Sequence, residues 1–125
     1  MRHLTRIAVV VWLSIAGGAV PAFAEGNAAR GRLAYQRTCI ACHGDSKTAS
    51  SVGPSLVGLI GRRAGTVAGT PYGRSLYESG IIWDEAALQR YLASPSDEVH
   101  GTIMPIGAQD PVERDDLVAY LKSLQ

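Results

Sequence analysis

The stretch Cys39-Ile40-Ala41-Cys42-His43 contains both cysteines of this 125-residue chain and places a histidine directly after the second one. The CxxCH pattern is typical of the covalent attachment of a haem c. Two thiols separated by two residues on a helical turn can each form a thioether with one vinyl group on a porphyrin edge, and the next residue then lies under the iron. We therefore predict that Cys39 and Cys42 attach one haem and that His43 is an axial ligand of its iron.

Two other uses of a CxxC pair fit this sequence less well. Two cysteines in an oxidising compartment commonly form a disulfide, but a disulfide gives no reason for the adjacent His43. A thioredoxin-like redox pair requires a βαβ context, whereas strand-forming runs are scarce here and the flanking sequence is helical in character. A domain of this small size often needs a cofactor to complete its core.

The N-terminal stretch has the features of a secretory signal peptide. A basic region, an apolar run and a small-x-small cleavage site follow one another at residues 2–6, 7–20 and 22–24. The apolar run is shorter than the roughly 20 residues that a bilayer requires, which disfavours a membrane anchor. We expect residues 1–24 to be removed on export to the periplasm, leaving one domain over residues 25–125 that is not inserted in a membrane.

Met104 is the predicted second ligand of the iron. After removal of the signal peptide, Met104 is the only methionine that remains, and His100 is the only histidine besides His43. A lone methionine is usually core filler, but Met104 lies between turn residues in GTIMPIG (101–107) rather than on an amphipathic stripe. His100 lies in a polar stretch and remains the alternative ligand.

Composition indicates one small and nearly neutral globular domain. Apolar residues make up 46% of the chain and charged residues 18%, with a formal net charge of +1. Loss of Arg2 and Arg6 with the signal peptide leaves 10 basic against 11 acidic residues. These values exclude a disordered tail, a multidomain enzyme and a nucleic-acid binder that depends on bulk basicity.

Helix signals predict an all-α domain of about three to five helices wrapped around one covalently attached haem. One helix is expected over residues 28–38 after Gly26-Asn27, and another over residues 85–94, between the cap Asp84 and the terminating Pro95. The last helix has the clearest start, because Asp110, Pro111 and Glu113 form a variant of the capping box. Residues 44–80 are rich in Gly, Ser, Thr and Pro and are expected to wrap the haem without regular structure.

Ordered motifs extend along the chain beyond the CxxCH stretch. Gly31 and Tyr35 lie one turn apart in the first predicted helix, and the segments GPSL (53–56) and GLIGRR (58–63) follow in the glycine-rich region. The sequence RDDLVAYLKSL (114–124) closes the chain. With these motifs, the chain after the signal peptide resembles the class I c-type cytochromes, the family of mitochondrial cytochrome c and of soluble monohaem cytochromes c of bacteria.

This resemblance implies a small cytochrome c fold and a set of residues around the haem. Gly31 and Tyr35 are expected to pack against Leu117 and Tyr120 of the last helix. Donors are needed wherever a propionate is buried. The further residues that the resemblance places at the haem are Pro54, whose carbonyl accepts from His43, Arg62, Tyr72 and Trp83 near the propionates, and Tyr91 and Thr102 on the methionine side.

The function expected from these features is soluble, periplasmic one-electron transfer by a low-spin His/Met-ligated haem c, and not enzymatic catalysis. Partners are expected to be redox proteins that dock transiently at the haem edge of a monomer. The chain has only two lysines, Lys47 and Lys122, so strong electrostatic steering toward an acidic partner is not expected. Two alternatives stay open: a haem subunit docked permanently on a larger dehydrogenase or oxidase, and a gas-binding or peroxidase-type cytochrome with a displaced methionine.

Overall fold

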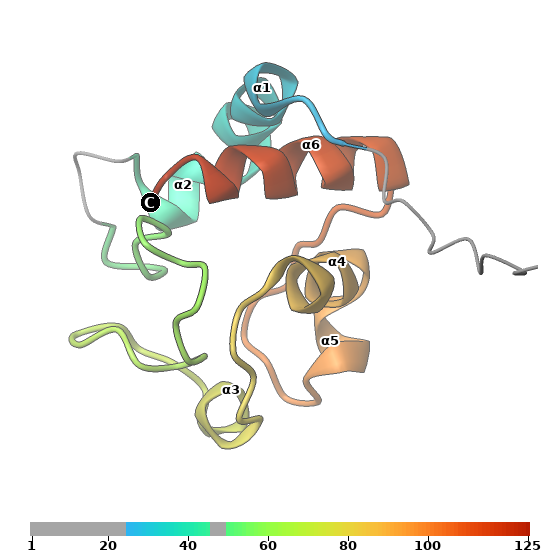
Figure 1. Cartoon of the computed structure of the whole chain (residues 1–125). Helices are drawn as coiled ribbons and strands as arrows, with labels where there is room; N and C mark the ends of the chain where they lie inside the picture. The colour runs from blue at the N-terminus through green and yellow to red at the C-terminus, as the bar shows by residue number, and fades with distance from the viewer. Residues whose placement is uncertain (1–24, 46–49) are drawn as a thin grey trace, which may run out of the picture.

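The computed structural model describes residues 25–45 and 50–125 (Figure 1). Within these ranges the chain is helical, with a single isolated bridge between Arg63 and Ile82 and no strand. The helices are α1 (Ala28–Thr38), α2 (Ile40–His43), α3 (Arg74–Glu78), α4 (Glu85–Ala93), α5 (Pro95–Glu98) and α6 (Pro111–Lys122). The all-α expectation is confirmed, and the described helices number six rather than three to five because α2, α3 and α5 are single turns of four or five residues.

Two sequence predictions concern residues beyond the described part. The predicted signal peptide, residues 1–24, and Lys47 both lie outside it. Among the described helices, none combines the length and the apolar character needed to cross a membrane.

The three long helices begin at the residues whose side chains cap them. Asn27 accepts a hydrogen bond from the backbone N–H of Arg30 at 3.0 Å, and Asp84 accepts one from Ala87 at 2.7 Å. The carboxylate of Asp110 accepts from the N–H groups of Val112 and Glu113. Because the first N–H groups of a helix have no partner within it, such side chains determine where each helix starts.

Helix α6 crosses α1 and packs against it at the crossing (Figure 1). Gly31 makes the close crossing possible, since a Cβ at this position would lie 1.9 Å from the carbonyl oxygen of Asp116. The rings of Tyr35 and Tyr120 meet beside it with centroids 5.3 Å apart, and Leu117 is buried. The structure thus brings together the four residues that the sequence places at this crossing.

Hydrogen bonds to the buried carboxylate of Asp116 join the start of α1 to α6. Asp116 accepts hydrogen bonds from Nε and Nη2 of Arg30 at 2.6 and 2.8 Å, and from the backbone N–H of Asn27 at 2.6 Å. The hydrogen bonds from Arg30 and Asn27, together with the positive charge of Arg30, hold the pKa of Asp116 below its usual value. The carboxylate therefore stays ionised and partnered although its side chain is buried.

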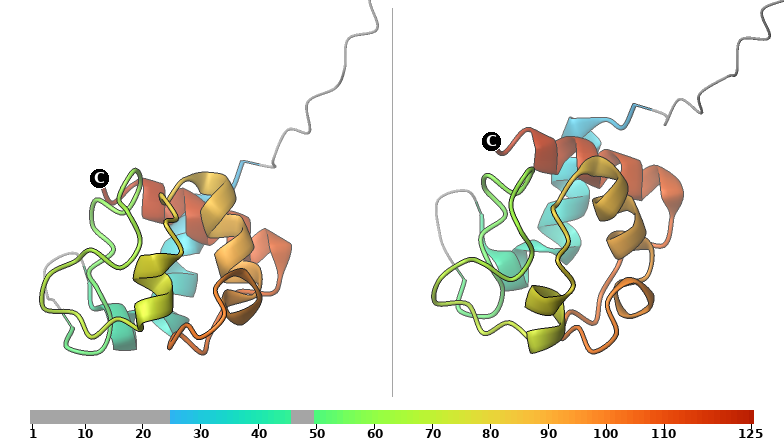
Figure 2. Two further views of the ribbon diagram at one scale, coloured as in Figure 1. Left: turned by 90° about the horizontal axis from the view of Figure 1, so that it is seen from below. Right: turned by 60° about the horizontal axis from the view of Figure 1, so that its bottom comes forward.

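Helix α3 lies at the far end of the molecule from the α1–α6 pair, residues 50–73 run along one side and α4 and α5 close another (Figure 2). Two predictions are corrected here. The region expected to be irregular over residues 44–80 contains α3, and Pro95 starts α5 as well as ending α4. Proline is compatible with the first turn of a helix because the N–H that it lacks would have no partner there.

The irregular region is tied back to the helices by backbone hydrogen bonds. Gly58 donates to the carbonyl of Leu124 at 2.9 Å, which places the loop beside the C-terminus. The N–H of Gly61 bonds to the carbonyl of Trp83 at 2.7 Å, and the N–H of Trp83 bonds to the carbonyl of Arg62 at 2.9 Å. These bonds join residues 58–62 to Trp83 and to the C-terminal end of the chain.

Candidate cofactor site

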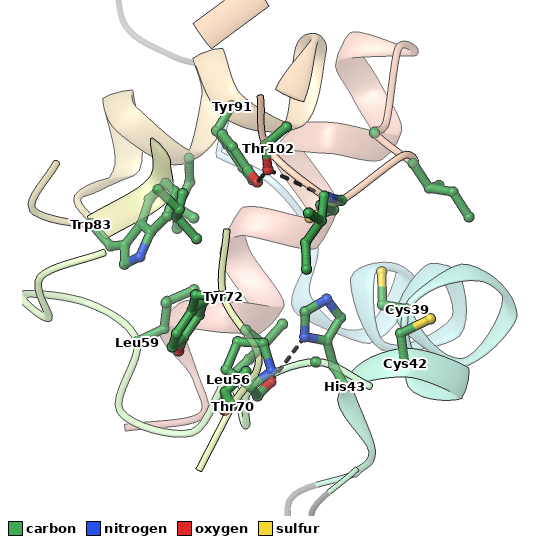
Figure 3. Close-up of a pocket in the computed structure, with 18 of the residues that line it drawn as sticks. Cys39, Cys42, His43, Leu56, Leu59, Thr70, Tyr72, Trp83, Tyr91 and Thr102 are labelled. Atoms are coloured by element: carbon green, nitrogen blue, oxygen red, sulfur yellow. Dashed lines mark hydrogen bonds between the residues drawn. The ribbon is translucent and has the colours of Figure 1, made fainter. Parts of the chain in front are cut away.

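One large pocket lies between α2, residues 52–73, α4 and residues 102–108 (Figure 3). Most of its lining is apolar. All ten residues that the sequence analysis places at the haem line this pocket, namely Cys39, Cys42, His43, Pro54, Arg62, Tyr72, Trp83, Tyr91, Thr102 and Met104. They come from elements far apart in the chain, so the fold rather than local sequence brings them together. His100, the alternative ligand, is exposed and is not part of the lining.

The imidazole of His43 is oriented by a backbone carbonyl. Its Nδ1 lies 2.9 Å from the carbonyl oxygen of Pro54 (Figure 3). The preceding residue, Gly53, donates its N–H to the carbonyl of Cys42 at 2.7 Å, and a Cβ on Gly53 would come within 3.0 Å of the imidazole ring. A carbonyl at Nδ1 assigns the proton to that nitrogen, which leaves the Nε2 lone pair free to bind a metal.

The two cysteines lie next to His43 on the turn of α2, and neither forms a disulfide (Figure 3). Burial, with smaller contributions from Glu113 and Cys42, raises the pKa of the Cys39 thiol to about 11. A thioredoxin-like cysteine requires the opposite, a lowered pKa that makes thiolate available. The helical surroundings of both cysteines argue against a thioredoxin-like redox pair, which requires a βαβ context.

On the side of the pocket that carries Met104, the chain is anchored by hydrogen bonding to the buried Tyr91. The hydroxyl of Tyr91 lies 2.6 Å from Oγ1 of Thr102, which in turn accepts the backbone N–H of Met104 at 3.4 Å (Figure 3). Tyr91 packs edge-on against Trp83 with ring centroids 5.1 Å apart. Burial raises the pKa of Tyr91, so its hydroxyl stays protonated and able to hydrogen bond.

The three residues predicted to donate to the propionates, Arg62, Tyr72 and Trp83, differ in the contacts that they make within the protein. Arg62 donates to the carbonyls of Ser55 at 2.8 Å and Val57 at 3.1 Å, so part of its guanidinium already holds the loop. The oxygen of Tyr72 accepts the N–H of Val67 at 3.2 Å, which leaves its O–H to donate elsewhere. Trp83 is almost fully buried and lines the pocket.

Much of the apolar lining was not identified from the sequence as part of a site. The residues concerned are Leu56, Leu59, Leu76, Leu88 and Leu117. A local signal existed only for the apolar island at residues 56–60, which stands out in a region of Gly, Ser and Thr. At the rim, Val52, Ile103 and Ile106 line the pocket while their side chains remain exposed.

The chemistry of this pocket fits an iron porphyrin better than a bare metal ion. The described residues hold no cluster of three or more His, Cys, Asp or Glu side chains, as a bare ion would need. They provide two adjacent thiols, one oriented imidazole, one thioether and a largely apolar cavity with a few N–H and O–H donors. Such a set fits a large, flat and apolar group that brings its own metal and carries a few anionic substituents.

Comparisons with known proteins agree with this chemistry. The profile of the family described as cytochrome c matches residues 28–125. The chain is 39% identical over 101 residues to cytochrome c2 of Rhodopila globiformis, covering 80% of this chain and 95% of that protein. It is 40% identical to cytochrome c of Chlamydomonas reinhardtii, covering 80% and 94%. The structure of cytochrome cH from Methylobacterium extorquens superposes with a TM-score of 0.71 at 41% identity, covering 78% of this chain and 99% of that one.

Proposed function

Because the chain belongs to the cytochrome c family and carries one covalently attached haem c, we propose that it is a soluble, periplasmic carrier of single electrons with His43 and Met104 as axial ligands. The family consists of electron carriers that interact with redox partners, and not of enzymes. The ligand pair, the compartment and the mode of docking are the parts that this proposal adds.

The observation that carries the proposal is the convergence of an oriented imidazole and a tethered thioether on one apolar pocket. Haem bound there supplies a one-electron Fe(III)/Fe(II) couple. Cys39 and Cys42 would hold it through thioethers, and the carbonyl of Pro54, 2.9 Å from Nδ1 of His43, would leave the Nε2 of His43 free to bind the iron. With Met104 as the sixth ligand, both axial positions are filled and no substrate has access to the metal.

The polar residues of the pocket stabilise the charged edge of the haem and the methionine side. Arg62, Tyr72 and Trp83 are the donors available to the propionates, where an unpaired carboxylate would be costly to bury. Tyr91 and Thr102 anchor the segment that carries Met104. These residues tune the iron through hydrogen bonding and exclusion of water rather than by direct ligation.

The exposed rim of the pocket is the proposed docking surface. Val52, Ile103 and Ile106 are 58%, 63% and 49% exposed and line the pocket opening. We propose that a monomer presents this apolar rim to redox proteins in small, transient contacts, below about 1,200 Å² in total. The same rim also favours a second candidate, a haem subunit held permanently on a larger dehydrogenase or oxidase, because exposed apolar groups gain most from lasting burial.

Optical spectroscopy of the exported holoprotein tests the ligand pair. We expect the oxidised protein to show the weak iron-to-thioether charge-transfer band, and the reduced protein not to bind CO. Met104→Ala should retain covalent haem, lose the band and bind CO, whereas the matched control His100→Ala should behave as wild type. A wild-type protein that lacks the band, and that gains CO binding in His100→Ala but not in Met104→Ala, would move the sixth ligand to His100. CO binding by the wild-type protein would favour the gas-binding or peroxidase alternative.

The location and the assembly are tested on the protein from its native cells. We expect the intact mass of the periplasmic protein to correspond to a chain that begins at Glu25 with one haem added. On size exclusion it should elute as a monomer. Elution with a catalytic subunit would favour the permanent complex, and an uncleaved chain in the membrane fraction would contradict the export proposal.

A further inference from the structure

The segment that carries Met104 is fastened to the rest of the protein at three places. At its start, Thr102 bonds to Tyr91 of α4. At its end, the N–H of Ala108 donates to the carbonyl of Leu92 of α4 at 2.6 Å. The third fastening comes from α6, where Nη1 of Arg114 donates to the carbonyl of Ala108 at 2.8 Å and to that of Gln109 at 3.0 Å.

Arg114 is itself held in place by side chains of α4 and α6. Its Nε donates to Oε1 of Gln89 at 2.9 Å, and Nε2 of Gln89 donates to Oδ1 of Asp115 at 2.7 Å. Asp115 therefore orients the amide of Gln89, and that amide orients the guanidinium. None of these three side chains lines the pocket, so the network acts on the site only through the segment that it holds.

From this arrangement we propose that Arg114 is a positioning residue. It keeps residues 102–109 in their observed position against α4 and α6, the closed form, and thereby sets how easily Met104 is displaced from the iron. The inference rests on the proposed ligation by Met104. The segment has no regular structure, so its closed form depends on a small number of hydrogen bonds. Bonds from a charged guanidinium are stronger than neutral ones, and bonds made only in the closed form shift the equilibrium toward it.

The test is the binding of imidazole to the ferric holoprotein of Arg114→Met. The substituted side chain keeps an apolar stem but donates no hydrogen bond. Because imidazole binds only after Met104 leaves the iron, we expect its apparent affinity to rise roughly tenfold, which corresponds to about 1.4 kcal/mol. Amide hydrogen exchange of residues 101–109 should accelerate, while exchange in α1 should not change.

Lys122→Met is the matched control. Lys122 pairs with Glu85, so it links the same two helices, α6 and α4, away from the methionine segment. Its removal should leave both the imidazole affinity and the exchange of residues 101–109 as in the wild type. An equal change in both variants would show a general effect of loosening the two helices and would overturn the proposal.

Two further variants separate positioning from folding. Arg114→Lys keeps the charge but not the fork of donors, so its imidazole affinity should lie between wild type and Arg114→Met. Gln89→Met should act in the same direction with a smaller effect, and less than additively in combination with Arg114→Met, because both belong to one network. If Arg114→Met does not fold, unchanged imidazole affinity in both Arg114→Lys and Gln89→Met overturns the proposal.

Failure of the ligand assignment has a different signature. A wild-type protein without the iron-to-thioether band would contradict ligation by Met104, whatever the variants do. Hydrogen exchange then still decides whether Arg114 closes the segment. Wild-type exchange at residues 101–109 in Arg114→Met would show that it does not.

Discussion

The α1–α6 pair and the segment over residues 99–110 hold their shapes by different means. In the helix pair, the backbones touch at Gly31, and Leu117 and Val118 are buried beside the crossing. The segment has no helix or strand; Val99 and Ala108 are buried, but Ile103 and Ile106 face solvent. Its path depends on individual hydrogen bonds to α4 and α6.

This contrast predicts which substitutions each region tolerates. Packed helices respond to changes of volume, because a close-packed interior has no room to adjust. A segment held by a few hydrogen bonds responds to loss of a donor or acceptor, and it can open locally while the rest of the fold persists.

The largest effect is expected for Gly31→Val. The added side chain would collide with the carbonyl of Asp116 and force α1 away from α6, which should lower the free energy of unfolding by about 3 kcal/mol. Guanidinium denaturation of the holoprotein measures this loss. Ala29→Val, an exposed position on the same helix, is the matched control and should cost less than about 1 kcal/mol. Equal losses would mean that helix propensity, and not the close crossing, explains the effect.

Gly107→Ala applies the same steric test to the methionine segment. A Cβ at Gly107 would lie 2.4 Å from the carbonyl oxygen of Leu92 and 2.9 Å from Cδ of Pro95. We expect a smaller loss of about 2 kcal/mol, because the segment can shift where a helix pair cannot. The iron-to-thioether band should weaken in this variant. Gly80→Ala, whose added carbon would meet no atom within 4 Å, is the control: it should carry only the cost of its positive φ and keep the band.

Asp116→Asn should cost about 1 kcal/mol at neutral pH through loss of charge-assisted bonds to Arg30 and Asn27. The folded-state pKa of Asp116 is lowered, so its contribution to stability is complete above the unfolded value of about 4 and is lost as pH falls through the folded value. Denaturation at several pH values should show the gap between wild type and variant closing in acid. Asp97→Asn, which removes an exposed carboxylate of α5, is measured in parallel as the control for the loss of one charge. A gap that persists at low pH would contradict the ionic contribution.

The smallest effect on stability is expected for Ile106→Ser at the rim. About half of this side chain is exposed, so the free energy of unfolding should change by less than about 0.5 kcal/mol. Denaturation against wild type measures it. A loss above about 1 kcal/mol would place Ile106 in the core of the methionine segment instead of on a docking surface.

Features that depend on neighbouring residues were predictable. The caps Asn27, Asp84 and Asp110 start their helices where expected, because an N-cap is decided by a side chain and the N–H groups two or three residues later. Helix α3 was not predicted, since five residues after a glycine-rich stretch provide too little periodicity. Pro95 was interpreted only as a helix end, although proline also fits the first turn of the next helix.

The candidate site also contains residues that the sequence identifies and residues that it does not. Cys39, Cys42 and His43 identify their own chemistry because the three residues act together within one turn. The apolar lining and the network of Gln89, Arg114 and Asp115 were not predicted, because a leucine or an arginine on a helix carries no local sign of what it will contact.

The linear order of residues is thus sufficient to establish the attachment motif, the helix starts and the short inventory of candidate iron ligands, all of which depend on residue type and near neighbours. Tertiary structure alone decides that Pro54 meets His43, that Thr102 meets Tyr91 and that Arg114 reaches the carbonyls after Met104. These contacts join different helices and loops, and their distances depend on how α4 and α6 pack around the pocket. Packing of this kind is a collective result of many buried side chains, which no single motif encodes.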